Sequence, residues 1–79
     1  MNLVFDIEAN GLNPDKIFCV VAQEIESKKV YAFGEESVAE GLEFLSKATK
    51  LIGHNILGYD LPVILKLHDL NLYDKVILD

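Results

Sequence analysis

The sequence LVFDIE at residues 3–8 decides the fold. Its apolar residues alternate with Val4, Asp6 and Glu8, which is the period of a β-strand with one face in a core. Asp6 and Glu8 therefore project side by side from one face of the strand, about 7 Å apart. Two such carboxylates repel each other unless a cation or a shared proton lies between them, and Mg²⁺ and Mn²⁺ prefer oxygen ligands. The stretch predicts either a divalent metal site or an edge strand whose acids face water.

The composition is that of a small, acidic and unusually apolar chain. Its 79 residues suffice for one domain, and 51% of them are hydrophobic, which is much apolar surface for so small a core. We therefore expect a further polypeptide or a second copy of the chain to cover part of that surface. The net charge is −6 and every basic residue is a lysine, which argues against a protein that holds nucleic acid by bulk electrostatics.

The sequence gives no sign of a membrane span or of export. No apolar run approaches the length of a membrane span, and Met1 leads directly into a strand without a signal peptide. Cys19 is the single cysteine and lies in an apolar run, so a disulfide framework is excluded. These observations predict a cytoplasmic protein that does not bind membranes.

The first half of the chain predicts three strands and a helix. The strands at residues 3–8, 17–22 and 29–33 are joined by short polar loops, which is typical of an antiparallel meander. The second of them is continuously apolar, so we expect it to be buried on both faces. A helix then begins at Ser37, which with Glu40 fits a capping box.

The second half predicts a strand, a helix and a last strand. The fourth strand is expected at residues 50–55, the second helix begins at residues 60–63 with Pro62 in its first turn, and the fifth strand occupies residues 76–79. Strands that follow helical crossovers run parallel to the first strand. Residues 1–79 thus predict a single α/β domain with a mixed sheet.

This topology gathers polar residues at one end of the sheet. Ligands of open α/β sheets bind at the carboxyl ends of the strands. Asp6, Glu8 and Asn55 lie near such ends, and Asp60 enters the second helix from there, so three carboxylates and one amide converge. Asp60 also stands where a helix N-cap would, and Asn55 could satisfy the backbone of a loop, so each residue has a structural alternative.

Two motifs in the sequence resemble those of one enzyme family. FDIEANGL at residues 5–12 resembles the first motif of the DnaQ-like (DEDD) 3′–5′ exonucleases, and GHNILGYDLP at residues 53–62 resembles the second. The second motif looks most like that of the proofreading exonuclease domains of family A DNA polymerases from short-tailed phages. The resemblance covers essentially the whole chain. It implies a ribonuclease-H-like mixed sheet of order 3-2-1-4-5, three antiparallel strands followed by parallel strands, with two helices and an end after strand 5.

The resemblance implies the N-terminal part of a metal-dependent 3′–5′ DNA exonuclease. Such an enzyme hydrolyses phosphodiester bonds at the 3′ end of single-stranded DNA with two Mg²⁺ or Mn²⁺ ions, in the host-cell cytoplasm if the chain is phage-encoded. Asp6 would bridge the two ions, Glu8 would bind one, and Asp60 would support the second through water. Leu12 would pack against the 3′-terminal base and Asn55 would line the substrate cleft. Taken from the residues alone, Leu12 could equally be ordinary core or turn packing.

The third motif of the family has no counterpart in the sequence. It contains an aspartate and, four or five residues before it, a Tyr or His that orients the attacking water. Tyr73 and Asp79 flank a strand that precedes this motif in the family, so Asp79 resembles a strand-end aspartate and not the missing ligand. We expect the missing part to come from a further polypeptide, such as the polymerase remainder or a partner chain. The alternative is a catalytically inactive exonuclease-like module that binds a polymerase or another replication protein, or that forms a homo-oligomer.

Overall fold

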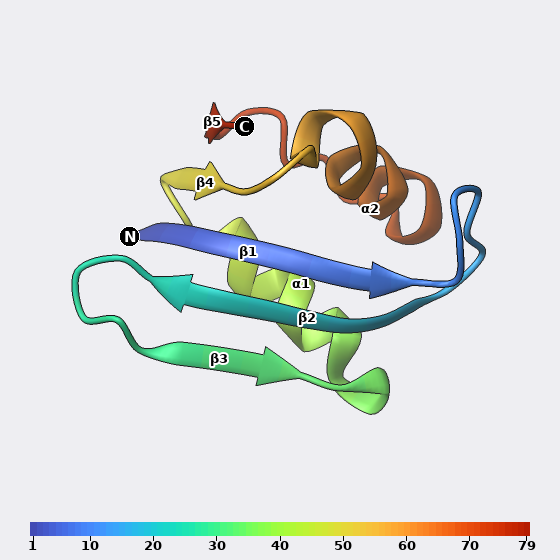
Figure 1. The fold of residues 1–79 in the computed structure, drawn as a ribbon, viewed down its shortest axis with the longest axis horizontal. Helices are drawn as coiled ribbons and strands as arrows, with labels where there is room; N and C mark the ends of the chain where they lie inside the picture. The colour runs from blue at the N-terminus through green and yellow to red at the C-terminus, as the bar shows by residue number, and fades with distance from the viewer.

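A computed structural model describes all 79 residues of the chain. The strands and helices, in chain order, are β1 (Asn2–Ala9), β2 (Ile17–Glu24), β3 (Val30–Phe33), α1 (Val38–Ser46), β4 (Lys50–Ile52), α2 (Leu61–His68) and β5 (Val76–Leu78) (Figure 1). A 3₁₀ turn (Glu35–Ser37) leads into α1, and a single π-helical turn (Ile56–Asp60) leads into α2. Neither helix has the length and apolar character that crossing a membrane requires.

The five strands form one mixed sheet with the order β3-β2-β1-β4-β5. β1 and β3 each pair antiparallel with β2, whereas β4 runs parallel to both β1 and β5. This arrangement confirms the predicted α/β fold, the strand order and the two helices. β1, the strand that carries Asp6 and Glu8, lies at the centre of the sheet.

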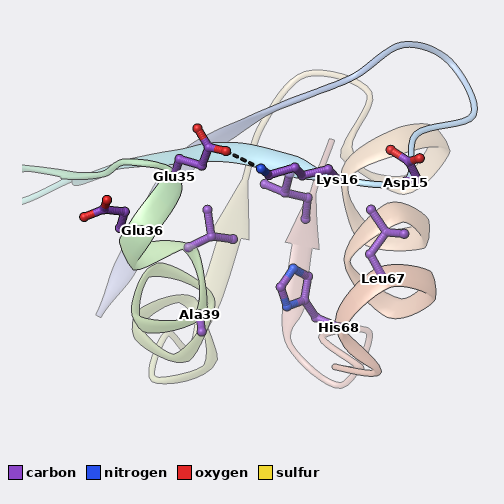
Figure 2. Close-up of a pocket in the computed structure, with 9 residues that line it drawn as sticks. Asp15, Lys16, Glu35, Glu36, Ala39, Leu67 and His68 are labelled. Carbon is purple, nitrogen blue, oxygen red and sulfur yellow. Dashed lines mark hydrogen bonds and ion pairs between the residues drawn. The ribbon is translucent and has the colours of Figure 1, made fainter.

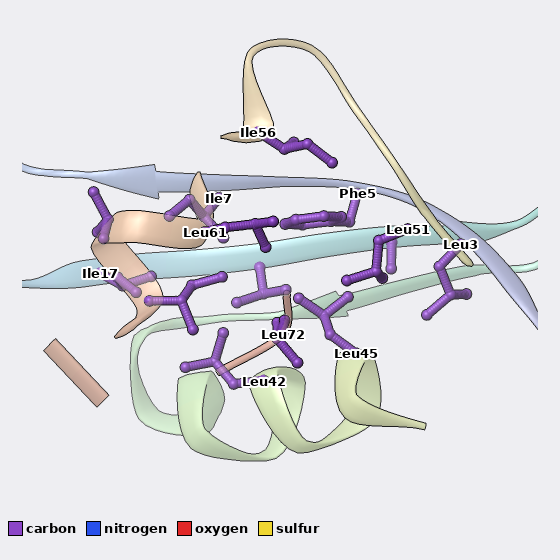
Figure 3. Packing of buried hydrophobic residues seen from close by; sticks show 14 of the residues in the cluster. Leu3, Phe5, Ile7, Ile17, Leu42, Leu45, Leu51, Ile56, Leu61 and Leu72 are labelled. Carbon is purple, nitrogen blue, oxygen red and sulfur yellow. The ribbon is translucent and has the colours of Figure 1, made fainter. Parts of the chain in front are cut away.

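One face of the sheet carries the hydrophobic core. Leu3, Phe5 and Ile7 point from β1 into this core, where they belong to one cluster with Leu45 of α1 and Ile64 of α2 (Figure 3). All five side chains are at most 4% exposed. Both helices therefore cover the same face of the sheet, which leaves the side chains of the opposite face without a helix over them.

The opposite face of the sheet is open and partly apolar. Val4, Val21 and Val30 lie on neighbouring strands and are 41%, 40% and 58% exposed. The expectation that β2 is buried on both faces is thus wrong, because α1 and α2 pack on one side only. Asp6 and Glu8 belong to this open face, and the strand register places Asp6 opposite Val21. The two carboxylates therefore lie beside apolar surface that this chain leaves uncovered.

Helix α1 begins without the predicted capping box. The side chain of Ser37 makes no capping hydrogen bond to α1, and its hydroxyl instead donates to the carbonyl oxygen of Gly34 at 3.4 Å. The backbone N–H of Ser37 donates to the same carbonyl at 3.0 Å. Ser37 is therefore bonded back to the start of the 3₁₀ turn, and the predicted capping box does not form.

Candidate functional site

The end of β1 projects beyond its neighbour β4. β4 pairs only with the first three residues of β1, Asn2, Leu3 and Val4. The remainder of β1 therefore has no strand beside it on that edge, although its backbone N–H groups still need partners. The segment that follows β4 fills this gap and brings the second sequence motif against the first.

Asp60 joins the two motifs directly. Its Oδ2 accepts a hydrogen bond from the backbone N–H of Ile7 at 3.2 Å, across 53 residues of sequence. The carboxylate takes the position that a carbonyl of a neighbouring strand would otherwise occupy. Asp60 is only 3% exposed and makes no capping hydrogen bond to α2. The interpretation of Asp60 as a simple N-cap is therefore wrong.

The raised pKa of Asp60 shows that its surroundings disfavour the negatively charged form of this side chain. Burial raises the pKa of this carboxyl from its ordinary 3.8 to about 6, although the hydrogen bond from Ile7 opposes the rise. The negative charges of Asp6 and Asp79 raise the pKa further. Three carboxylates are thus close enough to influence one another, and a cation near Asp60 would relieve the repulsion.

The segment between β4 and α2 is shaped by residues distant in sequence. Asn55 adopts the left-handed conformation, with φ 54° and ψ 33°, and its carbonyl accepts the N–H of Tyr59 at 3.0 Å. The side chain of Asp79 accepts the backbone N–H groups of Ile56 and Leu57 at 3.2 and 3.1 Å. The last residue of the chain thus caps the π-helical turn, a type of irregularity that is frequent at functional sites.

Leu12 is exposed on a loop that hydrogen bonds hold in place at the residues on either side of it. The Tyr59 hydroxyl donates to the carbonyl of Gly11 at 2.6 Å, and the Lys66 ammonium donates to Oδ1 of Asn13 at 2.7 Å. Leu12 itself is 96% exposed, so the alternative that it is core or turn packing is wrong. Tyr59 anchors this loop, a role that was not predicted. The only sequence signal for this role is the position of Tyr59 in the second motif.

One cleft of about 360 Å³ brings together most of the predicted site residues. It is lined by four of them: Asp6, Leu12, Asn55 and Asp60. Glu8 does not line the cleft, although it shares the open face of β1 with Asp6. His54 and Tyr59 complete its polar lining.

The ligand chemistry of the cleft suits a hard cation, but the ligand set is short. The carboxylates of Asp6 and Asp60 and the amide of Asn55 are oxygen donors of the kind that Mg²⁺ and Mn²⁺ prefer. However, no group of three or more His, Cys, Asp or Glu side chains in the structure is arranged to hold a metal ion. Asp6 and Asp60 therefore form the acidic pair around which a metal site could be completed.

Comparison with known proteins supports the fold but does not identify the chemistry of the cleft. No protein-family model matches the sequence, and no curated protein matches it. Among solved structures, the chain is similar to the family B DNA polymerase of the hyperthermophilic archaeon Pyrobaculum calidifontis, with a TM-score of 0.67 and 18% sequence identity. The match covers 86% of this chain and 11% of that polymerase. The chain therefore has the fold of a small part of a DNA polymerase.

The bond between Tyr59 and Gly11 gives the first testable prediction. Tyr59→Phe removes the hydroxyl and keeps the ring that packs against the core, so we expect a loss of about 1 kcal/mol of stability. Amide hydrogen exchange at Asn10 and Gly11, whose N–H groups are hydrogen-bonded within the loop, should become at least severalfold faster, whereas exchange in β2 should change only in proportion to the lost stability. Unchanged exchange in the loop would show that Tyr59 does not anchor it.

Proposed function

We propose that the chain is part of a divalent-metal-dependent 3′–5′ exonuclease that acts on single-stranded DNA, as the proofreading domain of a DNA polymerase does. The observation that carries the proposal is the buried carboxylate of Asp60, held against β1 in the same cleft as Asp6. The two sequence motifs and the likeness to part of a DNA polymerase support it.

Asp6 and Asp60 would hold Mg²⁺ or Mn²⁺ in this cleft, with Glu8 as a further ligand from the same face of β1 as Asp6. Bound there, the metal would supply an activated water and would stabilise the negative charge that develops on the phosphate during hydrolysis. The protein contributes a rigid anchor, because β1 is the central strand and Ile7 fixes the Asp60 carboxylate. The acids alone repel a DNA phosphate, so substrate binding in this cleft depends on the cation.

Leu12 and Asn55 would bind the DNA end beside the acids. Leu12 makes little contact within the chain, and its loop is held by Tyr59 and Lys66, so its side chain is ready to pack against a base. Asn55 presents an exposed amide in the same cleft, where it can donate to and accept from a nucleotide. Together the two residues would orient the terminal nucleotide over the acidic pair.

The missing metal ligand would come from a polypeptide that packs on the open face of the sheet. Asp6 and Glu8 lie on this face beside the exposed side chains of Val4 and Val21. A polypeptide that packs its apolar side chains on these valines would also lie next to the carboxylates. It could then supply the further acid and the water-orienting residue that the two motifs lack.

A second candidate function is a catalytically inactive exonuclease-like module that binds a polymerase, another replication protein or itself. The absence of a group of three metal-ligating side chains already arranged around one point and the uncovered valines favour it. A 3′-labelled single-stranded oligonucleotide with Mn²⁺ separates the two candidates. Release of labelled nucleotide by the purified chain, abolished by Glu8→Ala, would exclude the inactive module.

Substitution of Leu12 tests the substrate cleft. Because Leu12 is 96% exposed, Leu12→Ser should leave the melting temperature unchanged. It should weaken binding of a 3′-labelled oligonucleotide in Mg²⁺ about tenfold, because burying a leucine against a base contributes on the order of 1.5 kcal/mol. Leu57→Ser, at a 47% exposed leucine outside the cleft, is the matched control and should bind normally. Equal affinities for all three chains, measured by fluorescence anisotropy, would remove Leu12 from the substrate site.

A further inference from the structure

Two adjoining hollows lie between α1 and α2, away from the candidate cleft. The larger has a volume of about 420 Å³ and the smaller about 240 Å³. Ala39 of α1 and His68 of α2 line both, so the hollows adjoin, and we call the two together the acidic groove. Figure 2 shows the larger hollow, with Ala39 on one side and Leu67 and His68 on the other.

The acidic groove has apolar walls and a negatively charged rim. Leu42 and Leu70 line the smaller hollow and Leu67 the larger. Four carboxylates also line the groove and form its rim: Asp15, Glu35, Glu36 and Glu43.

The negative charge of the rim is largely uncompensated. Lys16 is the only lysine that lines the groove, where His68 is the one other basic side chain, and Lys16 already forms an ion pair with Glu35 (Figure 2). Glu36 and Glu43 are exposed and form no salt bridge. The groove therefore combines a place for an apolar side chain with unpaired negative charge around it.

The acidic groove is separate from the proposed exonuclease site. None of Asp6, Leu12, Asn55 and Asp60 lines either hollow. The metal site and the DNA end therefore do not account for the groove, and a ligand could occupy it while the cleft is in use.

We propose that the acidic groove binds a basic segment of a partner protein. An apolar side chain of this segment packs against Leu67 and Leu70, and its lysines or arginines pair with Glu36 and Glu43. Charge complementarity identifies this occupant, because the rim is acidic and the whole chain carries a net charge of −6. Nucleic acid is repelled by the same charge, and so at long range is a second copy of this chain.

The test uses two synthetic peptides of 12 residues that each contain a single tryptophan between apolar residues. One carries lysines at its remaining positions, and its matched control carries glutamates. The chain contains no tryptophan, so the emission of the peptide reports binding directly. Titrations in EDTA keep the result independent of the exonuclease proposal. We expect a blue shift and saturable binding of the lysine peptide and no binding of the glutamate peptide.

Two double variants of equal charge locate the binding site. Glu36→Gln with Glu43→Gln removes two rim charges and should weaken binding of the lysine peptide about fivefold. Glu26→Gln with Asp74→Asn removes two exposed charges outside the groove and should change binding less than about twofold. Ala39→Gln, which places a longer neutral side chain in the groove, should also weaken binding.

Four results would overturn the proposal. Equal weakening by the two double variants would mean that net charge alone attracts the peptide. Binding of neither peptide, or equal binding of both, would show that the groove does not select a basic segment. A dimer of the chain that dissociates only in the Glu36→Gln, Glu43→Gln variant would place a second copy, and not a partner, in the groove.

Discussion

Asp60→Asn should stabilise the metal-free chain by about 3 kcal/mol at pH 7.5. Burial, reinforced by the charges of Asp6 and Asp79, raises the pKa of Asp60 from 3.8 to about 6, and each pKa unit corresponds to about 1.4 kcal/mol. Ionised Asp60 is therefore disfavoured in the folded chain. Asparagine removes the charge and keeps an oxygen that can accept the N–H of Ile7.

The gain from Asp60→Asn should depend on pH in a defined direction. Below about pH 4, Asp60 is protonated in the folded and the unfolded chain, and the two proteins should have similar stability. Between about pH 4 and pH 6 the unfolded chain loses the proton first, so the wild type loses stability as the pH rises. Above about pH 6 the difference should reach a plateau.

Urea unfolding in EDTA at several pH values measures this difference. Asp74→Asn, at an exposed acid far from the cleft in sequence, is the matched control and should give a small difference that does not depend on pH. A variant Asp60→Asn that is less stable than the wild type at pH 7.5 would mean that the ionised carboxylate stabilises the fold, and the electrostatic account of the cleft would be wrong.

Mg²⁺ should raise the melting temperature of the wild-type chain, and Asp6→Ala should abolish this rise. An ion at ten times its dissociation constant stabilises the folded state by about 1.4 kcal/mol, which for a domain of this size corresponds to about 5–10 °C. The physical reason is that a cation beside Asp6 and Asp60 compensates a negative charge that burial, and to a lesser extent the neighbouring carboxylates, make unfavourable.

Two further variants test whether the effect of the metal depends on the cleft. Asp60→Asn should lose most of the rise, and Asp74→Ala should keep all of it. Ca²⁺ and K⁺ at matched ionic strength separate a site from general screening of the net charge of −6. A rise of the same size in wild type and Asp6→Ala would locate the effect elsewhere on the surface.

Much of the fold follows from local sequence patterns. The alternation in β1 correctly predicts which residues enter the core and that Asp6 and Glu8 share the other face. The burial of β2 could not be predicted from its sequence pattern in the same way. Its apolar run is equally consistent with a strand covered on both faces and with one whose second face is left open, and only the placement of the two helices decides between them.

Most of the predicted site residues line the candidate cleft, but Glu8 was wrongly expected to line it and the contacts were not predictable from the sequence. The strand ends bring Asp6, Asn55 and Asp60 together as the topology predicts, and the same cleft contains Leu12. The exact contacts depend on partners far away in sequence, such as Ile7 for Asp60 and the end of β5 for the π-helical turn. No local signal encodes such pairs, and so the sequence left an N-cap open as an alternative interpretation of Asp60.

If the cleft between β1 and the second motif holds a divalent cation, Mn²⁺ bound there can be located by NMR. Paramagnetic Mn²⁺ broadens the NMR signals of nearby nuclei, so a titration of the ¹⁵N-labelled chain locates the ion. We expect substoichiometric Mn²⁺ to broaden the amide signals of Ile7 and Asn55 much more than that of Glu43 in the acidic groove, and we expect Asp6→Ala to abolish this difference. Broadening spread over all acidic surfaces, or centred on the acidic groove, would contradict a cation site in the cleft.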